Sequence, residues 1–132
     1  MKKCRLRMKK ESLLEADSEV TEYYMGQMYE EDGILSIQYL EHPSNAFVHI
    51  IADISSVEIK RDAEISSHLL LKNHETIIVS IDSPYGQIQM ESYTEKIMKT
   101  NNFLFVEYRL MQQSEIIGHF KITWQILQEE TA

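Results

Sequence analysis

The chain contains little of what several protein classes require. A single cysteine among 132 residues excludes an internal disulfide framework and favours a reducing compartment, so we expect a cytoplasmic protein. No run of about 18 apolar residues is present, which excludes a membrane-spanning helix. The basic residues near the start are not followed by an apolar segment long enough for a secretory signal. Because these features are absent, we expect the protein to be neither secreted nor embedded in a membrane.

The length and the charge of the chain define its general class. A chain of 132 residues suits one domain spanning residues 1–132. Such a domain buries roughly 68% of its unfolded surface, enough for a core without cross-links. The chain carries 13 basic and 21 acidic side chains, a formal net charge of −8, which argues against a nucleic-acid partner.

The charge is unevenly distributed along the chain. Six of the thirteen basic residues lie in the first ten positions, whereas residues 11–32 contain eight acidic residues and no basic one. In the basic segment Cys4, Leu6 and Met8 alternate with basic residues, which is typical of a strand with one buried face. We therefore expect a basic first strand, with Cys4 in the core, to pair with the acidic segment that follows.

The composition favours strands joined by short turns. Sixteen isoleucines, five valines and six threonines suit a pleated, half-buried surface. The four glycines and two prolines fall at plausible breaks, and Asp32-Gly33 is a good hairpin signal. Apolar segments at short, regular spacing predict a β-sandwich or a β-barrel.

Period-two alternation is clearest near the C-terminal end. One expected inner face runs from Leu104 to Leu110, and the next from Ile116 to Ile126. Three segments also admit a helix: residues 12–24, which open with a capping-box pattern, residues 93–99, and the tail after residue 124. None of them has a sustained 3.6-residue stripe, so we favour strands.

One motif resembles a known protein family. Residues 83–94 read Ser-Pro-Tyr-Gly followed by a strand of the form Ile-x-Met-x-x-x-Thr, and residues 22–29 and 35–41 are similar in order to further family strands. Residues 105–110 and 118–122 match its closing hairpin. The chain thus resembles the YwiB-like family of bacterial proteins of unknown function. The resemblance implies an antiparallel meander barrel, calycin-like or lipocalin-like, of about eight to ten strands, and no established reaction.

Polar residues interrupt several faces that are otherwise apolar and expected to point inward. Glu41 and Arg61 could pair inside the barrel or at its mouth, because a buried charge needs an opposite charge. The seven members of this inward polar set are Tyr24, Tyr39, Glu41, Arg61, Ser92, Thr94 and Tyr108. Two interpretations remain open, namely a pocket for a small, partly apolar ligand and a filled barrel whose polar groups satisfy one another or water.

Nothing in the sequence marks catalytic machinery. The five histidines lack metal-ligand spacing, and no phosphate-binding loop or nucleophile elbow is present, so we expect no enzyme, cofactor or metal site. We expect His49 and His119 on outer strand faces. Phe47, Phe103 and Phe105 could be outward apolar residues. They support an alternative function, a ligand-free interaction module that forms a homo-oligomer or binds a partner through exposed strand edges.

Overall fold

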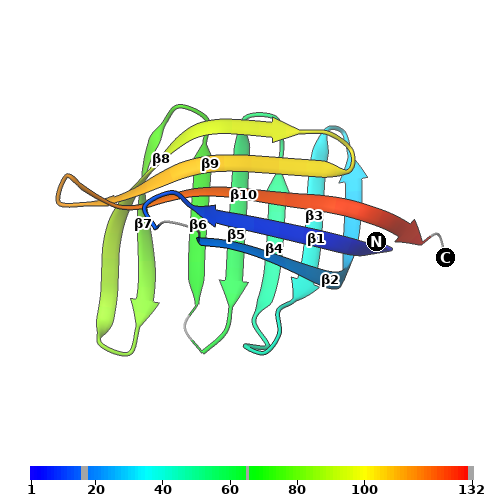
Figure 1. Ribbon diagram of the computed structural model, residues 1–132, viewed down its shortest axis with the longest axis horizontal. Helices are drawn as coiled ribbons and strands as arrows, with labels where there is room; N and C mark the ends of the chain where they lie inside the picture. The colour runs from blue at the N-terminus through cyan, green and yellow to red at the C-terminus, as the bar shows by residue number, and fades with distance from the viewer. Residues whose placement is uncertain (16–17, 65, 131–132) are drawn as a thin grey trace.

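The computed structural model describes residues 1–15, 18–64 and 66–130, and all regular structure in these residues is β-strand (Figure 1). The predicted all-β fold is confirmed, with a number of strands at the upper end of the expected range. The ten strands are β1 (Lys2–Ser12), β2 (Ser18–Glu31), β3 (Ile34–Leu40), β4 (Phe47–Ala52), β5 (Ser56–Asp62), β6 (Ser67–Lys72), β7 (Thr76–Ser83), β8 (Gly86–Lys99), β9 (Phe103–Gln112) and β10 (Glu115–Glu130).

The strands form a closed antiparallel barrel in meander order. Each strand pairs with its neighbours in the sequence, and β1 also pairs with β10, which closes the ring. The ladders are long except between β6 and β7, which share a single residue pair among the described residues, Ser67 with Ile81. The barrel is therefore continuous but loosely joined at one seam.

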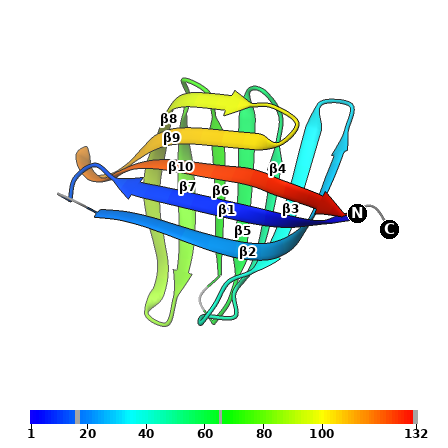
Figure 2. The same cartoon turned by 45° about the vertical axis from the view of Figure 1, so that its right-hand side comes forward.

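The barrel is flattened into two layers whose strands cross at a steep angle. In Figure 1 the strands β9, β10 and β1 run across the upright strands β3–β7, and Figure 2 shows the same crossing from the side. The strands β2 and β8 bend and so belong to both layers. Gly26 lies in β2, where an added Cβ would come within 2.5 Å of the Gln38 carbonyl oxygen. This close approach of two backbones explains a glycine inside a strand.

The first hairpins follow the predicted chemistry. Asp32 and Gly33 have φ angles of 53° and 79°, the positive pair that a two-residue I′ turn requires. The basic β1 pairs with β2 throughout its length, and Lys9 Nζ lies 3.3 Å from Glu11 and 3.6 Å from Glu19. The expected pairing of the basic strand with the acidic segment is confirmed.

The segments that also admitted a helix are strands wherever the structure describes them. Residues 93–99 lie in β8, and the chain after Trp124 continues β10. In the first segment β1 ends at Ser12 and β2 begins at Ser18, while Ala16 and Asp17 lie outside the described residues. Among the described residues we find no helix long and apolar enough to cross a membrane.

Three β-bulges displace the alternation that the sequence suggested. One lies between Thr94 and Lys96 in β8, and another between Ile116 and Gly118 in β10. A third, between β1 and β10, leaves Leu127 without a partner in β1 and exposed. Ile116, expected on the inner face, is exposed because the extra residue of its bulge interrupts the alternation before Gly118.

Candidate functional site

The inner face of the barrel is sealed over one half. There the inward side chains of every strand from β1 to β6, and of β9 and β10, are almost completely buried, and Cys4 is among them as predicted. We call this region the sealed half. Its principal residues are Cys4, Leu6, Met28, Leu35, Ile37, Ile50, Ala52, Val57, Leu71, Leu104, Val106, Ile122, Trp124 and Ile126.

Toward the other mouth the inward side chains become exposed to solvent. The inner face of β6 shows the change in two residues, since Leu71 is fully buried whereas Leu69 is only half-buried. We call this region the open half. Its inward apolar residues are Met8, Val20, Ile59, Leu69, Ile81, Ile88, Met90, Leu110 and Phe120. An apolar inner wall that solvent can reach is the form expected of a ligand site rather than of a filled core.

A tyrosine and tryptophan cluster forms the floor between the two halves. The rings of Tyr24 and Tyr39 stack with their centroids 4.7 Å apart, and Trp124 Nε1 donates a hydrogen bond of 3.2 Å to the Tyr39 hydroxyl. Burial raises the pKa of Tyr39 to about 12, against the opposing effect of the Trp124 hydrogen bond. The Tyr39 hydroxyl is therefore neutral over the physiological range.

Two buried hydroxyl groups of the inward polar set have no hydrogen-bond partner within the described part of the chain. They are the Tyr24 hydroxyl and Thr94 Oγ1, and both residues are more than nine-tenths buried. A buried hydroxyl without a partner is costly, at about 1–3 kcal/mol. The neighbouring Ser92 does have an acceptor, the Ile77 carbonyl at 3.5 Å. A buried water molecule beside either hydroxyl would supply the missing hydrogen bond.

The remaining members of the polar set occupy the open half and its rim. The Arg61 guanidinium donates to both carboxylate oxygens of Glu41, at 3.0 and 3.4 Å, so the predicted pair exists. Arg61 keeps 37% of its side chain exposed, which places the pair at the mouth rather than inside. Tyr108 is buried opposite Thr94 and packs on Phe120 at 5.5 Å, and burial raises the pKa of Tyr108. Across the same mouth Lys10 Nζ lies 4.7 Å from the centre of the Phe120 ring.

The structure thus brings the seven predicted residues together in two groups. The first group contains Tyr24 and Tyr39 on the inner faces of β2 and β3, with Glu41, which follows β3, and Arg61 of β5 at the mouth. The second group, on β8 and β9, contains Ser92, Thr94 and Tyr108. Sequence reasoning missed the apolar residues of the open half, which look like ordinary core residues. No local signal distinguishes Leu69 from Leu71.

A second inward ion pair lies at the end of the sealed half. Lys99 and Glu30, on the inner faces of β8 and β2, meet at 3.2 Å, and the Lys99 side chain is only 5% exposed. The second carboxylate oxygen of Glu30 is buried and has no partner in residues 1–15, 18–64 and 66–130. A desolvated pair of this kind depends on both members, because either one alone would leave a buried charge.

A polar hollow lies over the seam between β6 and β7. It has a volume of about 340 Å³, and its walls include Arg61, Ser67, His68, Ser80 and Gln87. Among the described residues β6 and β7 share one residue pair, so this hollow lies where the described ladder is shortest.

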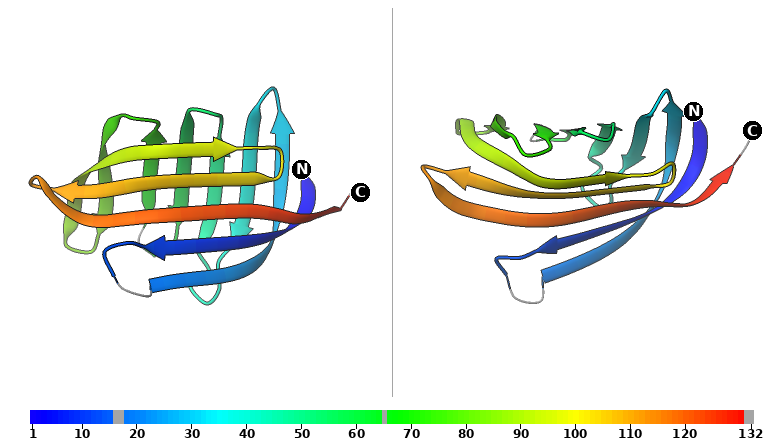
Figure 3. Two further views of the ribbon diagram at one scale, coloured as in Figure 1. Left: turned by 45° about the horizontal axis from the view of Figure 1, so that its top comes forward. Right: turned by 90° about the horizontal axis from the view of Figure 1, so that it is seen from above.

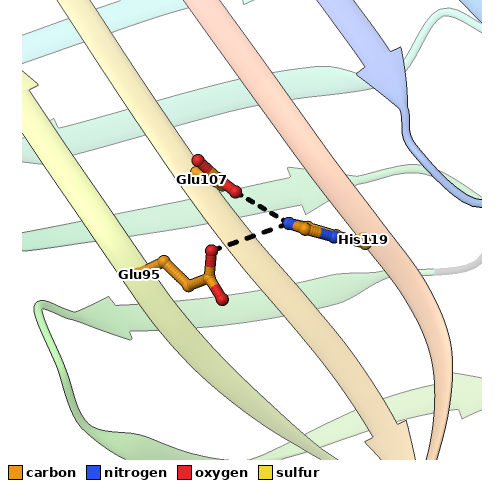
Figure 4. A group of neighbouring side chains, drawn as sticks. All are labelled: Glu95, Glu107 and His119. Carbon is orange, nitrogen blue, oxygen red and sulfur yellow. Dashed lines mark hydrogen bonds and ion pairs between the residues drawn. The ribbon is translucent and has the colours of Figure 1, made fainter.

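The outer face carries a second candidate site. Glu95, Glu107 and His119 lie on the neighbouring strands β8, β9 and β10, and Figure 4 shows both carboxylates directed at one ring nitrogen of His119. His119 Nε2 lies 2.8 Å from Glu107 and 3.8 Å from Glu95. Spacing along the chain suggested no metal site and placed His119 on an outer face. His119 does lie on an outer face. Its cluster with Glu95 and Glu107 could not be recognised from spacing along the chain, because it depends on the register of three strands.

Comparisons with known proteins agree with this architecture. The crystal structure of the ywiB protein from Bacillus subtilis superposes with a TM-score of 0.75 at 13% identity, covering 96% of this chain and 93% of that chain. At this identity the likeness shows the fold alone. Among curated proteins none matches the chain. A family model described as a domain of unknown function, DUF1934, matches residues 6–123. The chain belongs to the DUF1934 family.

Proposed function

We propose that the protein is a non-enzymatic binding protein that holds a small, partly apolar ligand in the open half of the barrel. The observation that carries the proposal is the graded exposure of the inner face, illustrated by fully buried Leu71 and partly buried Leu69 on one strand. Solvent-accessible apolar surface in a concave wall gains about 25 cal/mol per Å² when a ligand covers it. An occupant of this space is therefore favoured over water.

The side chains that line the open half indicate which kind of ligand would fit there. Half-buried aliphatic side chains and the Phe120 ring favour an apolar body. The charged rim of Lys10 and Arg61 favours a polar or anionic group at the mouth. The ligand class is thus a small amphiphile.

The test uses the anionic apolar fluorophore 1-anilinonaphthalene-8-sulfonate as the probe. Leu69→Trp would fill part of the open half, whereas Leu70→Trp changes the next residue, which points outward. We expect saturable binding to the wild-type chain, weakened at least about tenfold by Leu69→Trp and unchanged by Leu70→Trp. Near-ultraviolet circular dichroism of both variants checks that the fold is intact.

Equal binding by the two variants, or no binding by the wild-type chain, contradicts the proposal. Native mass spectrometry of the protein purified from its own source adds an independent measurement, since a retained occupant appears as a discrete increase in mass. The single tryptophan, Trp124, lies in the floor and reports the same event by its emission.

A second candidate function, self-association, rests on an apolar strip of the outer face. Leu40 and Phe47 are exposed and lie opposite each other across β3 and β4, and Met25, 63% exposed, lies beside them on β2. Closure of the barrel gives every strand two neighbours, so this face replaces the exposed edges that the sequence suggested. Sedimentation equilibrium would show a dimer that Phe47→Lys abolishes. A wild-type chain that stays monomeric at high concentration excludes this candidate.

A further inference from the structure

We propose that Glu95, Glu107 and His119 bind a divalent transition-metal ion such as Zn²⁺ on the outer face of the barrel. The three potential ligand atoms all lie within 4.8 Å of one another. A tetrahedral Zn²⁺ with bonds of about 2.1 Å holds its ligands about 3.4 Å apart. The separations of 2.8 and 3.8 Å between His119 Nε2 and the two carboxylates bracket this value, so small side-chain adjustments suffice.

The donor set suits such an ion. One imidazole and two carboxylates are ligands of zinc and of neighbouring first-row metals. Their side chains are 17–26% exposed, which removes much of the water that otherwise competes, yet leaves one side open for a water ligand. Two carboxylates directed at one point repel each other, and a cation between them removes that repulsion.

The backbone holds the ligands in place. Glu107 and His119 belong to the paired strands β9 and β10, and Glu95 is the extra residue of the bulge in β8. Without the bulge, strict alternation would continue from buried Thr94 and bury Lys96 instead of Ile97. Bulges commonly re-aim a side chain at a functional site, and this one directs Glu95 toward the histidine.

Charged neighbours complete the arrangement. Arg109 forms an ion pair with Oε1 of Glu95, which leaves Oε2 as the atom that faces His119. Lys121 lies opposite Glu107 across the ladder. Arg109 therefore acts as a positioning residue that orients one ligand, while the two cations limit the negative charge that the metal must balance. The site lies on the outer face, so it is independent of the ligand space inside the barrel.

The test measures Zn²⁺ binding to the full chain after removal of any affinity tag and of bound metal with a chelator. Isothermal titration should give one ion per chain for the wild type. His119→Ala and Glu107→Gln should each weaken binding at least about tenfold. The matched control is His49→Ala, because His49 also lies on an outer face but contacts Ser36 Oγ at 2.9 Å. This control should bind Zn²⁺ like the wild type.

A spectroscopic measurement keeps the test decisive if a variant is unstable. Co²⁺ bound to an imidazole and carboxylates absorbs in the visible range, so the wild type should acquire a band that His49→Ala retains and His119→Ala lacks. Equal Zn²⁺ binding by the wild type and His119→Ala, or no binding by the wild type, overturns the proposal. The cluster would then be an ion-pair network that joins three strands.

Discussion

The sealed and open halves of the barrel both have apolar inner walls, yet only the sealed half buries its wall almost completely. The difference follows from strand length. The five short strands β3–β7, about 4.8 Å apart, span about 19 Å from the first to the last, whereas the 16-residue β10 reaches roughly 50 Å. Long strands therefore extend past the layer that covers them, and Figure 3 shows the end of β1 and the start of β2 standing away from it. Strand length, rather than residue type, decides where the interior is open.

The largest expected effect tests this contrast with two leucines of β6. Leu71→Ala removes a fully buried side chain from the sealed half and should lower the free energy of unfolding by about 3–4 kcal/mol. Leu69→Ala, two residues away on the same face, should cost less than half as much because solvent already reaches that position. Urea denaturation of both variants measures the difference. Equal losses would mean that the two halves are packed alike.

The two ion pairs provide the next comparison. Glu30→Gln leaves the almost fully buried Lys99 ammonium without its counter-charge and should destabilise the protein by about 3 kcal/mol. Replacing Lys99 by methionine in the Glu30→Gln background should restore part of the loss, because no unpaired charge then remains in the sealed end. Denaturant unfolding of the single and double variants measures both effects. A Glu30→Gln protein as stable as the wild type would show that water reaches this end.

The free energy of unfolding should depend on pH through Tyr39, which lies in the cluster between the two halves. The pKa of Tyr39 is about 12 in the folded chain against 10 when exposed, so folding favours the neutral hydroxyl. This contribution is complete below pH 10 and disappears as the pH rises toward 12. Urea unfolding across that interval should show a steeper loss of stability for the wild type than for Tyr39→Phe. Parallel curves would remove Tyr39 as the cause.

The smallest effect is expected at the open mouth. Glu41→Gln removes the partner of Arg61, but the guanidinium remains hydrated because more than a third of its side chain is exposed. The loss in unfolding free energy should stay below about 1 kcal/mol. Denaturant unfolding therefore contrasts this rim pair with the Lys99–Glu30 pair. A loss of unfolding free energy as large as that caused by Glu30→Gln would place Arg61 inside the packed core.

Much of the fold was predictable because alternation survives in most strands. The inner faces of β1 and β9, the Asp32-Gly33 hairpin and the Glu41–Arg61 pair all follow from residue type and spacing. Prediction failed where a bulge adds a residue. Residues 93–99 looked ambiguous because the bulge at Glu95 shifts the inner face from Thr94 to Ile97.

The candidate sites were only partly predictable for a different reason. The inward polar set was found because each member stands in an otherwise apolar row. The open half exists because long strands of one layer extend past the short strands of the other. The outer cluster depends on the register of β8, β9 and β10. Both are relations between distant segments, and no single segment of the sequence contains them.

Closure of the ring by β1 and β10 has a consequence for the order of folding. Met8 pairs with Trp124, so one side of the first strand has no partner until the last strand has been synthesised. Such distant pairing is typical of domains that fold in milliseconds to seconds rather than microseconds. Until then β1 presents an open row of amide and carbonyl groups, and a chain interrupted before Glu115 would keep that row available to another molecule. Arrival of β10 is therefore the step that separates a closed barrel from a sheet open to aggregation.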